Sequence, residues 1–95
     1  MPAELSDEEA ALVERYADEN GLDEALVYAV MKTESDFDAE AVSAAKAKGL
    51  MQLTLPTFQW LQSKTGETLE GDALFDKEVN VRYGTLFLRL LQPRF

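Results

Sequence analysis

The chain has 95 residues, enough for one small domain that buries about two-thirds of the surface exposed by its unfolded chain. It contains no cysteine and no histidine, which excludes disulfides, thiolate or imidazole metal sites, and nucleophiles activated by histidine. The formal net charge of −9 argues against a protein that binds nucleic-acid phosphates.

The charge is unevenly distributed along the chain. Residues 1–45 hold 13 acidic and 2 basic residues, whereas residues 46–95 hold 5 acidic and 7 basic residues. We interpret the acidic half as a solvated face of the first helices. No basic segment followed by an apolar one opens the sequence, and no apolar run approaches about 18 residues, so we expect neither a signal peptide nor membrane insertion.

The first predicted helix follows Ser6-Asp7-Glu8-Glu9. This tetrapeptide matches the capping box, in which the Ser6 hydroxyl accepts from the Glu9 amide and the Glu9 carboxylate accepts from the Ser6 amide. Apolar residues then recur every three or four positions up to Ala17, and Asn20-Gly21 supplies a left-handed stop. The pattern predicts an amphipathic helix of about three turns.

A second helix is predicted from about residue 24 to 35, with Asp23 as its N-cap. Residues 25–31 are apolar on every side, which predicts a central position in the fold. The apolar run leads within one turn to Glu34, the first carboxylate since Glu24. A general acid must be protonated at the working pH, and partial burial at this place would favour the protonated carboxyl group.

Residues 50–53 are too few for more than a short extended segment. A third helix is predicted over 55–64, with Thr54 as its N-cap and Gly66 just beyond its end. Its inward-facing residues are expected to be Phe58, Trp60 and Leu61.

Residues 67–75 are predicted to be a loop, and Asp76 caps a fourth helix over 77–92 that ends before Pro93. Gly84, in the middle of that helix, indicates close approach by another backbone. The apolar face is expected to comprise Val79, Tyr83, Leu86, Phe87, Leu90 and Leu91. Together these elements predict a mainly α fold of about four helices with a short extended segment near residues 50–53.

Three motifs occur in order along the chain. They are Glu34-Ser35-x-Phe37, Gly49-Leu50-Met51-Gln52 and Asn80-(x)3-Gly84. Any one of them alone is a weak signal, but their order and spacing resemble the soluble lytic transglycosylase (SLT) domain, which is similar in fold to goose-type lysozyme. The resemblance covers roughly residues 8–95 and implies a lysozyme-like helical domain.

Domains of this kind cleave the β-1,4 bond between N-acetylmuramic acid and N-acetylglucosamine in peptidoglycan, without water, metal or cofactor, and leave a 1,6-anhydromuramyl end. The resemblance implies that Glu34 is the catalytic acid and then the base. Ordinary glycosidases use two carboxylates. We interpret Asp36 and Asp38 as solvated turn residues rather than as a second catalytic carboxylate.

The resemblance also implies that Ser35, Leu50, Met51 and Gln52 bind substrate. Ser35 is open to two roles, a hydrogen bond to substrate or a cap on helix carbonyls. The Gln52 amide is expected to reach the sugar or the Glu34 carboxyl group, with an ordinary surface amide as the alternative. Leu50 and Met51 are expected to form the floor of the glycan groove, although buried methionine is more often core.

Three further residues are assigned mainly structural roles. Asn80 and Gly84 are expected to pack against the helix that carries Glu34. Trp60, like Tyr83 in the fourth helix, has a side chain able to stack on sugars, and core packing is the preferred interpretation for both.

The chain departs from the family pattern in three places. Lys46 stands where the family usually has glycine, which matters if that position needs a positive φ. Leu55 and then Pro56 follow where the family has proline one position earlier. Members also continue past the last motif with a Tyr-Asn-Ala-Gly segment, so residues 1–95 are expected to be a single domain that is truncated at its C-terminus.

The expected function is therefore that of a peptidoglycan lytic transglycosylase, acting outside the cytoplasmic membrane on glycan strands. The alternatives are a catalytically impaired remnant that binds glycan or a partner protein, a lysozyme-type hydrolase, and a small acidic helical bundle with an interaction role. The oligomeric state is open, and self-association through an exposed apolar face is one expectation.

Overall fold

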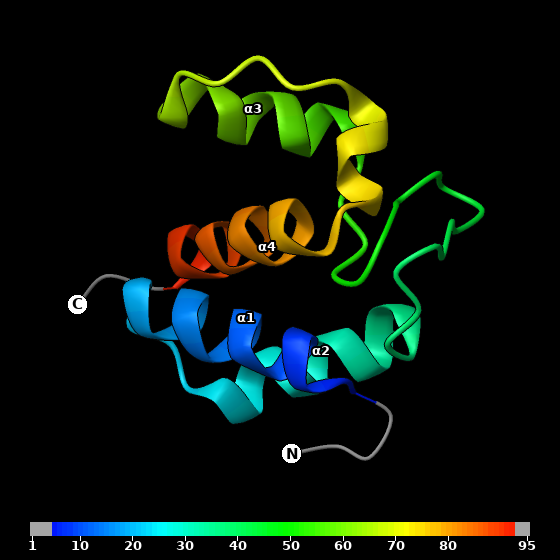
Figure 1. The fold of residues 1–95 in the computed structure, drawn as a ribbon. Coiled ribbons are helices and arrows are strands. Elements are labelled where there is room, and N and C mark those ends of the chain that lie inside the picture. Colours follow the sequence, from blue (N-terminus) through cyan, green and yellow to red (C-terminus); the bar gives the residue numbers. More distant parts are fainter. Residues whose placement is uncertain (1–4, 93–95) are drawn as a thin grey trace.

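The computed structural model describes residues 5–92, and its helices follow the order predicted from the sequence (Figure 1). The mainly α fold class is confirmed. The elements are α1 (Asp7–Glu19), α2 (Glu24–Ser35), α3 (Leu55–Thr65), the short 3-10 helix η1 (Gly71–Phe75) and α4 (Lys77–Leu91). None of the helices in this part of the chain is both long and apolar enough to cross a membrane.

The predicted N-caps are confirmed for the first two helices. At α1 the Ser6 amide donates to the Glu9 carboxylate over 3.0 Å, and the Glu9 amide donates to the Ser6 hydroxyl over 3.2 Å. At α2 the Asp23 carboxylate accepts from the Ala25 amide over 2.8 Å. These side chains pair amides that have no partner within the helix, and so fix where each helix begins.

The last two helices also begin where the sequence predicts. The Thr54 hydroxyl caps α3, and the Asp76 carboxylate caps α4 by accepting from the Val79 amide over 3.1 Å. Gly66 ends α3 with φ of +81°, a conformation that glycine adopts without strain. The loop predicted over 67–75 is partly wrong, because its second half forms η1.

The central helix is α4, not α2 as predicted. Figure 1 shows α4 between α3 on one side and α1 with α2 on the other. The α2 helix buries one stripe, made of Val27, Met31 and Ser35, while Leu26 is 40% exposed. An all-apolar run is therefore compatible with a helix that lies at the edge of the described fold.

The second buried face of α4 was missed because its residues are small or polar. Asn80, Val81, Gly84 and Thr85 are all buried, in addition to Tyr83. Of the apolar face predicted for this helix, Leu91 is exposed and the other members are buried or half-buried.

Two hydrophobic clusters lie on either side of α4. Between α1, α2 and α4 the buried residues are Leu5, Val13, Tyr16, Ala17, Val27, Met31, Leu50, Met51 and Val81. Between α3, η1 and α4 they are Leu53, Phe58, Leu61, Leu74 and Tyr83. In the second cluster the rings of Phe58 and Tyr83 meet edge to face, with centroids 4.9 Å apart.

Polar contacts hold α1 against α4 beside the first cluster. The Tyr16 hydroxyl donates to the Glu78 carboxylate over 2.7 Å, and the Asn20 amide donates to the Thr85 hydroxyl over 3.1 Å. Burial, together with the hydrogen bond to Glu78, raises the pKa of Tyr16. These contacts fix the register of the two helices.

A tight turn at residues 49–52 connects the long loop after α2 to α3. The main chains of Lys48 and Leu53 pair across it, with N–O distances of 2.9 and 3.1 Å. Within the short segment predicted near residues 50–53, Leu53 pairs in an extended manner with Lys48, and the residues before it reverse the direction of the chain.

The side chain of Asn80 fastens this turn to α4. Its amide oxygen accepts from the Met51 amide over 2.7 Å, and its amide nitrogen donates to the carbonyls of Lys48 and Leu74 over 2.9 and 2.8 Å. A Cβ atom at Gly49 would lie 2.2 Å from the Asn80 nitrogen, so only glycine fits there. The expectation that Asn80 packs against the Glu34 helix is wrong, because it packs against the turn.

Gly84 makes room for the side chain of Met51. A Cβ atom on Gly84 would lie 2.3 Å from the Met51 sulfur and 2.8 Å from its Cβ. The predicted close approach at this glycine is confirmed, but the neighbour is a side chain and not a backbone, and it belongs to the turn rather than to α2.

At the other end of the second cluster, Glu67 accepts hydrogen bonds from the Tyr83 hydroxyl and, over 2.6 Å, from the Arg82 guanidinium. These two bonds, that of Tyr83 first, hold the pKa of Glu67 below its ordinary value of 4.5. Burial and the neighbouring carboxylate raise the pKa of Tyr83. The network connects the loop after α3 to α4.

Lys46 adopts a φ of +65°. The position where the family usually has glycine therefore does have a positive φ in this chain. It lies in a turn in which the Lys46 amide donates to the Ser43 carbonyl over 2.9 Å. A residue with a Cβ atom is strained in this region by about 1–2 kcal/mol.

We expect Asn80→Ala to lower the free energy of unfolding by about 3 kcal/mol, because the buried Met51 amide and Leu74 carbonyl lose their bonds to this side chain. The half-buried Lys48 carbonyl keeps its bond from the Leu53 amide. Urea unfolding followed by circular dichroism measures the change. Asn20→Ala is the matched control, since it removes two amide bonds at a half-buried position and should cost about 1 kcal/mol. Equal costs for the two variants would contradict this account.

Lys46→Gly should raise the free energy of unfolding by about 0.5–1 kcal/mol. Relief of the positive φ outweighs the greater flexibility of glycine in the unfolded chain. Ala45→Gly, in the same turn but without a positive φ, should instead lower stability. A stabilising effect of both substitutions would show that the turn is simply tolerant of glycine.

Glu67→Gln should destabilise the domain at pH 6, and this effect should become smaller as the pH falls below 4.5. Because the pKa of Glu67 is lower in the folded chain than in the unfolded chain, its contribution is present above pH 4.5 and is lost as the pH falls through the folded value. Thermal unfolding of both proteins between pH 3 and pH 6 measures this. A difference in Tm that stays constant over that range would disprove the assignment.

Candidate functional site

A cleft of about 280 Å³ lies where α2, the 49–52 turn and α4 meet. Two lining residues come from α2, three from the turn and the residue after it, and three from α4. They are Val30, Glu34, Met51, Gln52, Leu53, Gly84, Phe87 and Leu88. Within this lining Glu34 is the only carboxylate, and most of the other residues are apolar.

Glu34 reaches the cleft because it stands four residues after Val30, on a face of α2 next to the buried stripe. Its side chain is exposed. The prediction that the apolar run partly buries the Glu34 side chain is therefore wrong. The α2 helix turns Val27 and Met31 toward the core and leaves Glu34 at the mouth of the cleft.

Ser35 is buried and ties α2 to the turn. Its hydroxyl lies 2.6 Å from the Leu50 carbonyl and 3.1 Å from the Met31 carbonyl, and it has one proton to donate. The hydroxyl is thus occupied within the protein, which argues against the predicted contact with substrate. Ser35 instead fixes the distance between the helix that carries Glu34 and the turn opposite it.

Leu50 and Met51 have different surroundings. Leu50 is fully buried in the first cluster, so the prediction that it forms the floor of the groove is wrong. Met51 is largely buried as well, yet its side chain lines the cleft beside Gly84. A thioether at such a place offers a polarizable, adaptable surface.

Gln52 lines the cleft and has a φ of +54°, a strained value for a residue with a side chain. Its amide nitrogen donates to the carbonyls of Ala41 and Gly49, over 3.0 and 2.8 Å. Both amide hydrogens are therefore used within the loop. If Gln52 contacts a sugar or Glu34 as predicted, only its amide oxygen can do so, and that oxygen can only accept a hydrogen bond.

The two other acidic residues near Glu34 are turn residues, as interpreted from the sequence. Asp36 ends α2 in a left-handed conformation and pairs with Lys32, and the Asp38 carboxylate accepts from the Glu40 amide over 2.9 Å. Neither lines the cleft. Within residues 5–92 no group of three or more acidic side chains is arranged to hold a metal ion.

The two aromatic residues in question differ from each other. Tyr83 is buried, which confirms core packing. Trp60 is 46% exposed, so the predicted core packing is wrong for it, and its ring meets that of Phe87 edge to face with centroids 6.4 Å apart.

Phe87 and Leu88 also line the cleft, although the sequence analysis did not assign them to the site. Their place beside Glu34 depends on how α4 packs.

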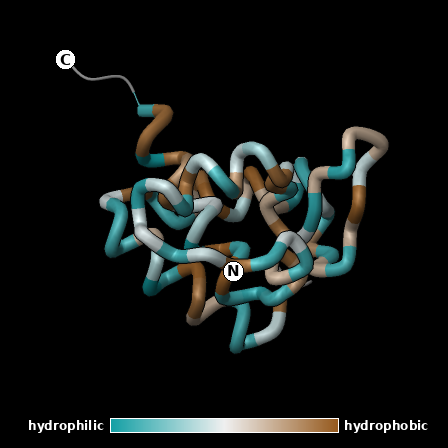
Figure 2. Tube along the Cα trace, turned by 90° about the horizontal axis from the view of Figure 1, so that it is seen from above, coloured by the Kyte–Doolittle hydropathy of each residue, from teal (hydrophilic) through white to brown (hydrophobic). Residues whose placement is uncertain are grey.

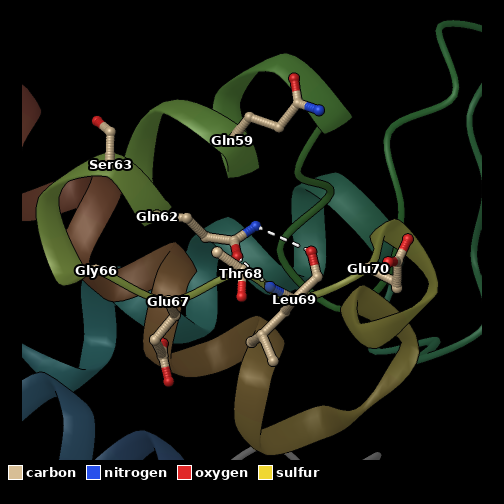
Figure 3. Close-up of a pocket in the computed structure, with 8 residues that line it drawn as sticks. All are labelled: Gln59, Gln62, Ser63, Gly66, Glu67, Thr68, Leu69 and Glu70. Carbon is tan, nitrogen blue, oxygen red and sulfur yellow. Dashed lines mark hydrogen bonds between the residues drawn. The ribbon is translucent and has the colours of Figure 1, made fainter.

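A second hollow, about 580 Å³ in volume and more open, lies between α3 and the loop that follows it (Figure 3). Two of its polar side chains, those of Gln62 and Glu67, are already paired within the protein. Gln62 exchanges hydrogen bonds with the main chain of Leu69, as Figure 3 shows for one of them, and Glu67 is held by Tyr83 and Arg82. The cleft at Glu34 is therefore the better candidate for a functional site.

Comparison with known proteins agrees with the motifs. A model of the Transglycosylase SLT domain family matches residues 11–95. The chain is 41% identical over 89 residues to membrane-bound lytic murein transglycosylase C of Yersinia pestis (strain Pestoides F), and 37% identical to that of Serratia proteamaculans (strain 568). Each match covers 88% of this chain and 24% of the relative. The chain thus spans about a quarter of the length of these relatives.

Two solved structures have the same fold. One is an inactive mutant of the lytic transglycosylase Slt of Pseudomonas aeruginosa, with a TM-score of 0.81 and 32% identity over 85% of this chain and 13% of that one. The other is the 70 kDa soluble lytic transglycosylase of Escherichia coli, with a TM-score of 0.81 and 24% identity over 86% of this chain and 14% of that one. On the evidence of the family match, the chain belongs to the Transglycosylase SLT domain family.

Proposed function

We propose that this chain carries the catalytic acid of a peptidoglycan lytic transglycosylase. It would cleave the β-1,4 bond between N-acetylmuramic acid and N-acetylglucosamine and leave a 1,6-anhydromuramyl end. The observation that carries the proposal is a single carboxylate, that of Glu34, at the mouth of a mainly apolar cleft in a member of this family.

Support also comes from the relatives. Those with the similarity reported above are named lytic murein transglycosylases. The Pseudomonas aeruginosa structure is that of an inactive mutant in which one glutamate is replaced by glutamine, so that enzyme requires this glutamate. A one-carboxylate mechanism differs from that of ordinary glycosidases, which hold two carboxylates on either side of the bond.

In the proposed reaction, Glu34 first donates its proton to the glycosidic oxygen while the bond from that oxygen to C1 of the muramyl residue breaks. The resulting carboxylate then takes the proton of the C6 hydroxyl group as the C6 oxygen bonds to C1. The proton count at Glu34 is restored and no water is consumed. General acid–base catalysis of this kind contributes about 10²–10⁴ to the rate.

The cleft lining fits this chemistry. A glycan strand over Val30, Met51 and Phe87 would displace water from the mouth of the cleft beside the Glu34 carboxyl group. The Gln52 amide oxygen is then available to accept from a sugar hydroxyl or acetamido N–H group. Neither step calls for a metal ion or an organic cofactor.

We propose the cell envelope, outside the cytoplasmic membrane, as the place of action. Peptidoglycan lies there, and the relatives with the similarity reported above are named membrane-bound. The strongly negative charge of residues 1–45 would keep that half of the surface away from other polyanions of the envelope.

Glu34→Gln should reduce release of muropeptides from purified peptidoglycan by at least about 100-fold, because glutamine has no proton to donate. Mass spectrometry of the soluble products measures the loss and identifies their ends. Asp36→Asn is the matched control, since it removes an exposed carboxylate two residues away that does not line the cleft. It should retain activity.

The products decide among the alternatives. Anhydromuramyl ends from the parent chain, absent with Glu34→Gln, are the expected result. Reducing muramyl ends would identify a hydrolase that delivers water to C1. If the folded parent chain releases nothing, the catalytic proposal fails for this chain, and a module that binds glycan without cutting it becomes the better description.

A further inference from the structure

The exposed indole of Trp60 is unexplained by the cleft alone. It is the single tryptophan of the chain, it lies on α3, and it is 46% exposed although large aromatic side chains are normally buried. Its ring contacts that of Phe87, which lines the cleft beside Glu34. The aromatic surface of the cleft therefore continues through Phe87 onto α3.

A cation accompanies this indole. The Lys64 ammonium lies 4.8 Å from the centre of the Trp60 ring, one helical turn along α3. Within the described part of the chain no carboxylate forms an ion pair with Lys64. Lys64 therefore places a positive charge at this end of the aromatic surface in a chain of net charge −9.

We propose that Trp60 and Lys64 form an outer sugar subsite, continuous with the Glu34 cleft, that holds a sugar whose substituent carries a carboxylate. An indole ring packs against the C–H face of a sugar, and the Lys64 ammonium, which lies over the Trp60 ring, would attract a carboxylate carried by that sugar. The inference rests on the proposed function, because peptidoglycan supplies such groups either as the lactyl carboxylate of the muramyl residue or as carboxylates of the attached peptide.

The negative field of the protein gives Lys64 a specific part in this subsite. A glycan strand that carries carboxylates is repelled by a surface of net negative charge, and a local cation offsets that repulsion where the strand must lie. The second hollow has no lysine or arginine in its lining, which instead includes the carboxylates of Glu67 and Glu70.

Fluorescence of the single tryptophan reports on the subsite directly. The full chain carrying Glu34→Gln, which prevents turnover, is titrated with three probes: uncharged chitotetraose, muramyl glycan with the peptides removed, and the same glycan with peptides attached. All three should shift the indole emission to shorter wavelength. The carboxylate-bearing glycans should bind more tightly than chitotetraose, and that preference should decrease as salt is raised from 0.05 to about 0.5 M.

Trp60→Ala in the same background should weaken binding of all three probes by about tenfold, measured by calorimetry because the fluorophore is lost. The matched control is Leu55→Ala, which removes an exposed apolar side chain of the same helix outside the cleft and should leave affinity unchanged. Circular dichroism checks that both variants fold.

Lys64→Gln should remove the preference for charged glycans, a change of about two- to fivefold, and leave chitotetraose unaffected. Lys48→Gln is its control, because Lys48 also lies over an aromatic ring, that of Phe75, and lines no part of the cleft. Which muramyl probe is preferred tells whether the lactyl or a peptide carboxylate is recognised.

The outcomes separate this inference from the function on which it rests. If the parent chain cuts peptidoglycan, and the protein with Trp60→Ala binds every probe as tightly as the protein that keeps Trp60, then the subsite proposal is overturned. The proposal of a transglycosylase stands in that case. If charged and uncharged glycans bind alike, the role of Lys64 is overturned. If no probe binds and no peptidoglycan is cut, both proposals fall.

Discussion

The cleft depends on one side chain, that of Asn80. Its amide pairs with a main-chain N–H group of the 49–52 turn and with two carbonyls, one before the turn and one near the end of η1. Two of these bonds are buried and the one to Lys48 is half-buried, and leaving buried main-chain groups unpaired is costly. Since Asn80 lies on the central helix, the turn is positioned relative to the whole core.

Several features of the sequence follow from this arrangement. Gly49 has no side chain because the Asn80 amide occupies the space, and Gly84 has none because Met51 does. Ser35 then closes the other side by bonding to the Leu50 carbonyl, which joins the helix of Glu34 to the same turn. The catalytic proposal thus rests on a carboxylate whose distance from Met51 and Gln52 is set by hydrogen bonds to α4 and α2.

The cleft is mainly apolar, and the described part of the chain also leaves several large apolar side chains exposed. On the helices these are Leu26 of α2, Leu55 and Trp60 of α3 and Leu91 of α4, and hydrophobic positions near the end of α4 stand out in Figure 2. A glycan strand has both apolar ring faces and polar edges, which suits a surface where aromatic and aliphatic groups alternate with a few amides and one ammonium. The acidity of residues 1–45 lies mainly on the solvated faces of α1 and the loop after α2.

The sequence by itself determined the helices, because capping side chains and left-handed glycines act within a few residues and were legible at Ser6, Asp23, Asp76 and Gly66. It also gave the family, through motifs whose spacing survives without coordinates. Only the tertiary structure decided that α4 is central, that Leu50 is core, that the amide hydrogens of Gln52 are used by the loop and that Trp60 is exposed. Those properties depend on which faces meet across the fold, and a face made of Asn80, Gly84 and Thr85 has no apolar period by which it could be recognised in advance.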